Sequence, residues 1–127
     1  MDNLGEGVEF ETMKGETIVR VTGLVAGSEL VELHCESGRT YSLFHNQDCC
    51  ENVAVEDVVG NIDDLIGVPL LMADATETHP EDDDESSTCT FYKLATVKGY
   101  MDIRWLGTSN GWYSETVGVY MRETKIP

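Results

Sequence analysis

Basic residues are scarce in this sequence. Its 127 residues include eight lysines and arginines against 24 aspartates and glutamates, which gives a formal net charge of −16. A protein that neutralises the phosphates of a long nucleic acid needs the opposite balance, so we expect no long nucleic acid as a partner. Removing the run Glu81–Glu85 would change the net charge only from −16 to −11. The rest of the chain is therefore expected to be acidic as well.

Long apolar runs are also missing. The stretch VPLLMA at residues 68–73 is among the longest, and it is far shorter than the roughly 20 residues that span a bilayer. The first residues, MDNLGEGVEFE, are acidic, whereas a secretion signal is basic and then apolar. We therefore expect a cytoplasmic protein with no membrane contact, in which the cysteines need not form disulfides. A chain of this length can bury one core, so residues 1–127 are expected to form a single domain.

Strand-like alternation, in contrast, is abundant. Segments rich in β-branched and aromatic residues are separated by glycine or polar turns at residues 17–24, 29–35, 40–45, 68–77, 88–97, 100–107 and 114–123. The segment NIDDLIG favours a short helical turn, because Asn61 can cap it and Gly67 can end it. We predict a β-rich α+β fold: a mostly antiparallel sheet of six to eight strands with one or two short helical turns. The acidic segment 79–88 is predicted to be an exposed loop.

Two hairpins are predicted from the turns. Gly38 in the turn ESGR should join residues 29–35 to 40–45, with Leu33 opposite Leu43 and Cys35 opposite Tyr41. The turn TSNGWY should join residues 100–107 to 114–123. Alternation then predicts one shared buried face, made of Met101, Ile103, Trp105, Val117 and Val119. Arg104 would lie on the opposite face, either solvated, stacked on a ring or bound to an anion.

The stretch FHNQDCCENV, residues 44–53, concentrates chemically reactive side chains. Zinc sites usually space their ligands by two to four residues, because adjacent residues of an extended chain point in opposite directions. Cys49 and Cys50 are adjacent, so we expect no metal site. Three alternatives remain open for these two cysteines: one is a nucleophile paired with His45, the two form a vicinal disulfide, or one is buried in the core. We expect at least one of them to pack against apolar side chains. Gln47 and Asp48 could instead cap the loop.

Three motifs resemble a family of small proteins found widely in bacteriophage genomes. They are H-x-Q-D-C-C-E starting at His45, D-L-I-G at residues 64–67, and R-W-L-G-x-S-N-G-x-Y-S-E from Arg104 to Glu115. The resemblance covers about Thr17 to Glu123, and this chain has Trp112 inside the last motif. The family is classed as a domain of unknown function. The resemblance therefore implies a phage origin and a fold rather than an activity.

A phage origin favours an accessory protein that blunts host defence, and one route is to bind and sequester a small nucleotide-like immune signal. The turn after Thr108 offers backbone amides for an oxyanion and aromatic faces for a base, and Arg104 can bind phosphate. Because so small a chain has little room for a deep pocket, we expect the site near an interface in a homo-oligomer. The predicted ligand-binding residues are His45, Gln47, Asp48, Arg104, Ser109, Asn110, Trp112, Tyr113 and Glu115.

The second route is an acidic nucleic-acid mimic or a protein-binding inhibitor of a host defence or nucleic-acid-processing protein. The net charge and the run Glu81–Glu85 favour it, although a mobile acidic loop loses entropy on binding. A hydrolase of a nucleotide signal ranks third, because paired histidines and metal ligands at useful spacing are missing. We predict no catalytic residue, no metal and no cofactor, and binding in the host bacterial cytoplasm is favoured over enzyme activity.

Overall fold

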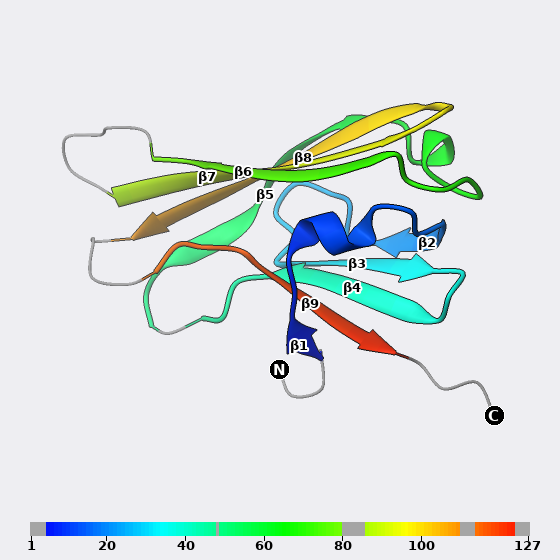
Figure 1. The fold of residues 1–127 in the computed structure, drawn as a ribbon. Helices are drawn as coiled ribbons and strands as arrows, with labels where there is room; N and C mark the ends of the chain where they lie inside the picture. The colour runs from blue at the N-terminus through cyan, green and yellow to red at the C-terminus, as the bar shows by residue number, and fades with distance from the viewer. Residues whose placement is uncertain (1–4, 48, 80–85, 110–113, 124–127) are drawn as a thin grey trace.

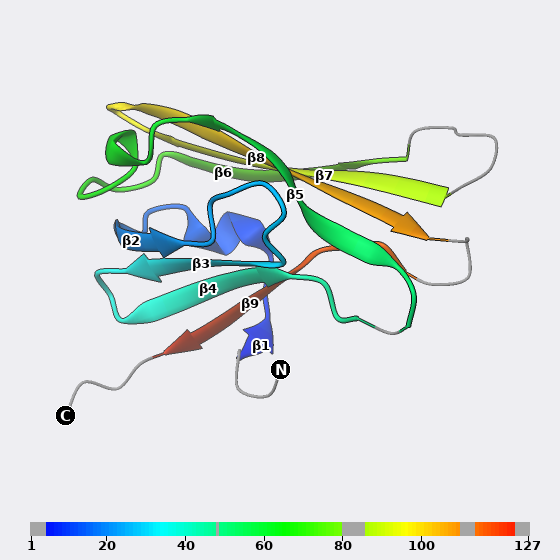
Figure 2. The same ribbon diagram turned by 180° about the vertical axis from the view of Figure 1, so that it is seen from behind.

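The fold consists of two antiparallel sheets that face each other (Figure 1). The computed structural model describes residues 5–47, 49–79, 86–109 and 114–123. The five-stranded sheet has the order β1 (Glu6–Gly7), β9 (Gly118–Glu123), β4 (Arg39–Phe44), β3 (Leu30–Cys35) and β2 (Ile18–Thr22). The four-stranded sheet has the order β5 (Asn52–Gly60), β8 (Gly99–Ser109), β7 (Ser86–Thr96) and β6 (Met72–Thr78). Figure 2 shows β5, at the edge of the four-stranded sheet, from behind.

The predicted β-rich, mostly antiparallel fold is confirmed, and its helical part is small. The described residues contain no α-helix and two 3-10 turns, η1 (Phe10–Met13) and η2 (Ile62–Asp64). The second turn forms as predicted: the Asn61 side chain accepts a hydrogen bond from the Asp63 N–H at 3.0 Å, and Gly67 has a φ of +86°. None of the described residues belongs to a helix long and apolar enough to cross a membrane.

The core lies between the two sheets, and β8 shows how alternation builds it. Met101, Ile103 and Trp105 are at most 2% exposed, whereas Asp102 and Arg104 between them lie on the outer face. Val117, Val119 and Met121 pack against the same core from the opposite sheet. The predicted buried face is therefore confirmed, with the two valines partly buried.

The hairpin predicted between residues 100–107 and 114–123 is wrong. β8 pairs with β5 and β7, whereas β9 pairs with β4 and β1 in the other sheet. Alternation identifies the buried face of a strand but not its hydrogen-bonded neighbour, and here the two apolar faces meet across the core. The place beside β8 belongs to β5, a strand that the sequence analysis did not predict.

The predicted β3–β4 hairpin forms with its register shifted by two residues. Leu33 lies opposite Tyr41 and Val31 lies opposite Leu43, while Gly38 has a φ of +92° in the turn. A shift of two residues keeps every side chain on its face. Leu33, Cys35, Tyr41 and Leu43 therefore share one face as predicted, although the facing pairs differ.

Two further segments differ from the sequence analysis. The N-terminal turn η1 was not predicted, yet its Phe10 and Met13 are buried in the core, and η1 contacts β6. Strand β6 ends at Thr78 and β7 begins at Ser86, so residues 86–88 of the predicted acidic loop belong to a strand. Residues 80–85 lie outside the described part of the chain.

Candidate functional site

His45 follows β4 directly and joins two distant parts of the chain. Its Nε2 lies 2.8 Å from Oε2 of Glu51, and its Nδ1 lies 2.7 Å from the carbonyl oxygen of Thr116. The side chains of His45 and Glu51 are 4% and 0% exposed. Because a carbonyl oxygen can only accept, Nδ1 carries a hydrogen and donates it to Thr116. The first motif is thereby attached to the segment that leads into β9.

The carboxylate of Glu51 organises the rest of the first motif. Its Oε1 accepts hydrogen bonds from the Cys49 N–H at 2.9 Å and from the Gln47 side-chain amide at 3.2 Å. The same amide donates to the Glu51 carbonyl oxygen at 2.6 Å. A buried carboxylate is costly unless it is paired and hydrogen-bonded, and these contacts supply the compensation. The spacing of His45, Gln47 and Glu51 thus has a structural reason.

The two adjacent cysteines lie on the surface and form a vicinal disulfide. The prediction that one of them packs against apolar side chains is therefore wrong. The reason is that the loop buries Glu51 instead. The next buried side chains along the chain are those of Val53 and Val55. Asp48 lies outside the described residues. Among the residues that are described, no group of three or more histidines, cysteines and acids is placed to hold a metal ion.

The third motif contains another buried carboxylate, Glu115, which is 5% exposed. It accepts hydrogen bonds from the hydroxyl groups of Thr88, at 2.8 Å, and Ser109. His79 Nδ1 lies 3.2 Å from the Thr88 oxygen. Because the single hydroxyl hydrogen of Thr88 goes to Glu115, Nδ1 of His79 is the donor in that contact. Asn110, Trp112 and Tyr113 lie outside the described residues.

The structure brings the first motif close to the end of the third motif but leaves Arg104, at the start of the third motif, apart from them. Thr116, the acceptor for His45, follows Glu115 in the chain. Arg104 and Ser109 lie on opposite faces of β8, and Arg104 pairs with Glu56 at 2.6 Å on the outer face. The described polar residues of the motifs, His45, Gln47, Ser109 and Glu115, all have hydrogen-bond partners within the protein. Their arrangement favours a structural role.

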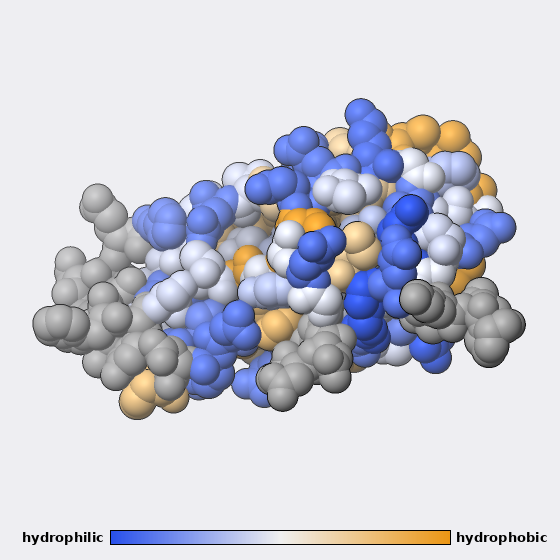
Figure 3. Space-filling view, turned by 60° about the horizontal axis from the view of Figure 1, so that its bottom comes forward, coloured by the Kyte–Doolittle hydropathy of each residue, from blue (hydrophilic) through white to orange (hydrophobic). Residues whose placement is uncertain are grey.

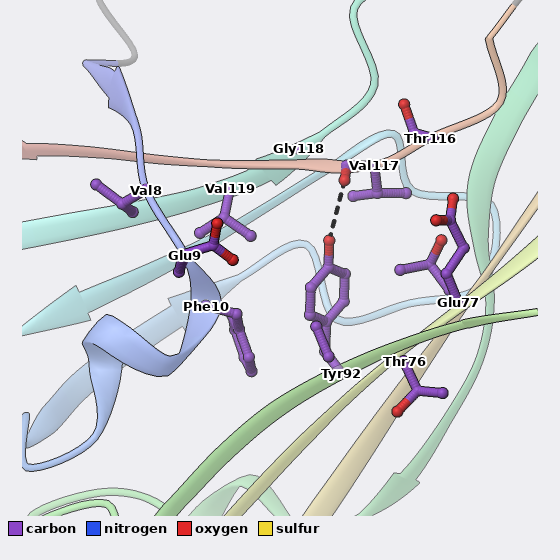
Figure 4. A pocket seen from close by; sticks show the side chains of 12 residues that line it. Val8, Glu9, Phe10, Thr76, Glu77, Tyr92, Thr116, Val117, Gly118 and Val119 are labelled. Atoms are coloured by element: carbon purple, nitrogen blue, oxygen red, sulfur yellow. Dashed lines mark hydrogen bonds between the residues drawn. The ribbon is translucent and has the colours of Figure 1, made fainter.

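A hollow between the sheets was not foreseen from the sequence (Figure 4). It has a volume of about 350 Å³ and combines residues from the segment after β1, from β6 and β7, and from the chain entering β9. A second hollow of about 330 Å³ shares Val8, Glu9, Gly118 and Val119 with it. We name the two together the β9 groove, lined chiefly by Val8, Glu9, Phe10, Glu77, Tyr92, Val117, Gly118 and Val119.

The β9 groove has an apolar floor and an acidic rim. The rings of Phe10 and Tyr92 pack with centroids 4.7 Å apart, and the Tyr92 hydroxyl donates to the Val117 carbonyl oxygen at 3.3 Å. Glu9 and Glu77 are exposed, and none of the described lining residues is basic. Burial, reinforced by the Glu77 carboxylate, raises the pKa of Tyr92. The phenol therefore stays protonated and acts as a donor.

The groove is formed by segments far apart in sequence, which is why the motifs did not reveal it. In Figure 3 most side chains on the face in view are hydrophilic, with small apolar patches between them.

A family model described as a domain of unknown function, DUF7448, matches residues 11–119. The chain belongs to the DUF7448 family. The match includes both buried carboxylates and the groove residues from Glu77 to Val119, and no curated protein or solved structure matches the chain.

Proposed function

We propose that this DUF7448 chain is a phage accessory protein that inhibits a host defence or nucleic-acid-processing protein by binding a basic segment of it. The observation that carries the proposal is the β9 groove, whose rim holds Glu9 and Glu77 and whose described lining contains no basic residue. Such a lining attracts cations and repels the phosphates of a nucleotide. The host bacterial cytoplasm is the proposed place of action.

The charge of the whole chain supports a basic protein partner. A net charge of −16 raises the encounter rate with a positively charged surface and makes that rate sensitive to salt. The hydrogen-bonded motifs support the same proposal indirectly. Because His45 and Glu51 hold the loop after β4 against Thr116, they fix the chain that enters β9 and hence one wall of the groove. The motifs would then act as positioning elements for a binding surface.

One observation favours a second candidate, the sequestration of a small nucleotide-like immune signal by a homo-oligomer. Arg104 pairs with Glu56 through Nη2, and its Nε is buried without a hydrogen-bond partner among the described residues, so only the outer part of the guanidinium is accessible. Its side chain is 41% exposed on the outer face of the four-stranded sheet. A phosphate could therefore meet the guanidinium there. Such a site would not include Ser109 and Glu115, which lie on the inner face.

A two-armed experiment separates these functions. Affinity-tagged protein is expressed in host cells, and co-purified proteins are quantified for the wild type, the Glu9→Gln/Glu77→Gln variant and the Arg104→Ala variant. We expect one or a few basic host proteins that are retained by the wild type and by Arg104→Ala but lost from the double variant. In the second arm, the purified protein is incubated with cyclic nucleotides and ADP-ribose derivatives, and the filtrate is assayed before and after heating.

Nucleotide depletion with intact release on heating would overturn the proposal in favour of the second candidate. In that case Arg104→Ala should weaken ligand binding about tenfold or more, because a hydrogen bond to a charged group is lost. Deletion of Glu81–Glu85 tests whether the protein is instead an acidic nucleic-acid mimic. Such a mimic should lose capture of the host protein when these residues are deleted, and it should keep capture in the Glu9→Gln/Glu77→Gln variant. A chemically altered nucleotide would indicate a hydrolase.

A further inference from the structure

We infer that the β9 groove takes an extended segment of the partner as an added strand alongside β9, with an apolar side chain on the groove floor and a lysine or arginine between Glu9 and Glu77. This inference rests on the proposed function and specifies how that partner is recognised. Three features of the described residues support it: unpaired backbone where the chain enters β9, an apolar floor and a rim of one charge.

The unpaired edge arises because β1 is short. β1 pairs with β9 at Gly7 opposite Tyr120, and the Val8 N–H still donates to the Val119 carbonyl at 2.9 Å. The chain then turns away into η1, which starts at Phe10. Val117 lies just before β9, and its carbonyl oxygen faces the groove, where the Tyr92 hydroxyl donates to it. No described strand lies beside it there.

The backbone at Val117 is available for pairing. Its carbonyl oxygen points into the groove, as the dashed line in Figure 4 shows, where it accepts a long hydrogen bond of 3.3 Å from the Tyr92 hydroxyl. The described residues offer no acceptor for the Val117 N–H. An added strand uses such main-chain donors and acceptors for affinity and uses pockets for alternate side chains for specificity.

The floor and rim define the chemistry of the segment. Phe10, Tyr92 and Val119 form an apolar surface on which an aliphatic or aromatic side chain can pack. Glu9 lies after β1 and Glu77 lies on β6, so the two carboxylates approach the groove from different elements. A cationic side chain between the two carboxylates would be attracted by both. Consecutive side chains of a strand point to opposite sides. Apolar and basic residues should therefore alternate in the segment.

Defined peptides test this inference without knowledge of the natural partner. The full chain is titrated with dye-labelled six-residue peptides that alternate valine with lysine or valine with glutamate, and binding is followed by fluorescence anisotropy. We expect the lysine peptide to bind with an affinity that falls as salt is added, and the glutamate peptide not to bind. Methylating alternate backbone nitrogens of the lysine peptide should weaken binding about tenfold or more, because strand pairing requires those donors.

Matched variants locate the site. Glu9→Gln and Glu77→Gln should each weaken binding about threefold to fivefold, as expected for a partly exposed ion pair. Glu36→Gln makes the same charge change in the exposed β3–β4 turn and should leave binding unchanged. Tyr92→Phe removes the hydroxyl that occupies the Val117 carbonyl, so it should leave binding intact or strengthen it.

The inference is overturned if backbone methylation has no effect, if Glu36→Gln weakens binding as much as Glu77→Gln does, or if no peptide binds. Its failure is distinguishable from failure of the proposed function. If a basic host protein is captured through Glu9 and Glu77 but no peptide binds, the strand mode is wrong and the function stands. If the peptide binds as described and no host protein is captured, the groove assignment stands and the proposed function fails.

Discussion

Nε2 of His45 and Oε2 of Glu51 lie 2.8 Å apart, with both side chains almost completely buried. The pair closes the loop after β4 upon itself, and the other ring nitrogen of His45 attaches that loop to Thr116. A single pair thus links the end of one strand to the entry into β9. Residues that look like a reactive centre in the sequence hold the fold together in the structure.

Replacement of Glu51 by alanine should destabilise the protein strongly. It leaves the His45 ring, the Cys49 N–H and the Gln47 amide without their common acceptor. Each buried donor that is left without an acceptor typically costs about 1 to 3 kcal/mol. Urea unfolding followed by circular dichroism measures the free energy of unfolding. Glu36→Ala, at an exposed turn, is the control and should change it by no more than about 0.5 kcal/mol. A loss below about 1 kcal/mol for Glu51→Ala would contradict the structural role.

Gly107 should not tolerate a larger residue. A Cβ atom at this position would lie 2.7 Å from the backbone oxygen of Glu115 and 3.1 Å from Val53. We expect Gly107→Ala to cost about 1 to 3 kcal/mol, since overpacking forces the backbone to move. Gly7→Ala is the matched control, because its Cβ would meet only Tyr120 at 4.0 Å. Equal thermal unfolding midpoints for the two variants would show that β8 and the segment around Glu115 are less closely packed than described.

Stability should fall in alkaline solution. Burial raises the pKa of the Cys35 thiol to about 12, and burial also raises the pKa values of Tyr41 and Tyr92. In the unfolded chain these groups lose their protons between about pH 8.5 and 10. The unfolded state then binds fewer protons than the folded state, so the stabilisation is complete below about pH 8.5 and is lost as the pH rises.

Chemical denaturation at a series of pH values measures this effect. The free energy of unfolding should decrease steadily above about pH 9. Tyr92→Phe should lessen the decrease, because it removes one buried group that must ionise on unfolding and loses only a long hydrogen bond. A stability that stays level up to about pH 11 would argue against protonated, buried phenols and thiol.

The four cysteines should differ in reactivity toward iodoacetamide. Without reductant, the vicinal disulfide protects Cys49 and Cys50, and the partly exposed Cys89 should react first. After mild reduction the two exposed cysteines of the motif should also react, whereas buried Cys35 should react only after denaturation. Intact mass spectrometry counts the alkyl groups at each stage. Rapid labelling of Cys35 in the native protein would contradict its burial.

Much of the fold could be predicted from local patterns, because local patterns produce it. The alternation of β8 gave the correct buried residues, and Asn61 and Gly67 marked a 3-10 turn. The predicted pairing of β8 with β9 was wrong, because the two strands pack on the same core but belong to different sheets. Strand order depends on which distant segments meet, and β5 was missed because the charged residues at 56 and 57 interrupt its alternation, where the structure has a bulge.

The candidate sites show the same division. The sequence pointed to His45, Gln47 and Glu115 as unusual, and the structure explains them as hydrogen-bonded groups, two with buried side chains and Gln47 at the surface. Polar residues in a motif look alike in sequence whether they bind a ligand or one another. The β9 groove, in contrast, combines side chains from segments around residues 8, 77, 92 and 117. No local pattern marks such a surface, since it exists only after the two sheets have packed.

The addition of an extended basic segment at Val117, where the chain enters β9, can be tested residue by residue. An NMR titration of the isotope-labelled protein with the valine–lysine peptide tests it most directly, because each backbone amide reports its own surroundings. The largest shifts are predicted at the amides of Val8, Val117, Gly118 and Val119, with the Val117 amide gaining protection from solvent exchange. Shifts that instead gather around Arg104 and Glu56 on the outer face, or no shifts at all, would contradict the claim.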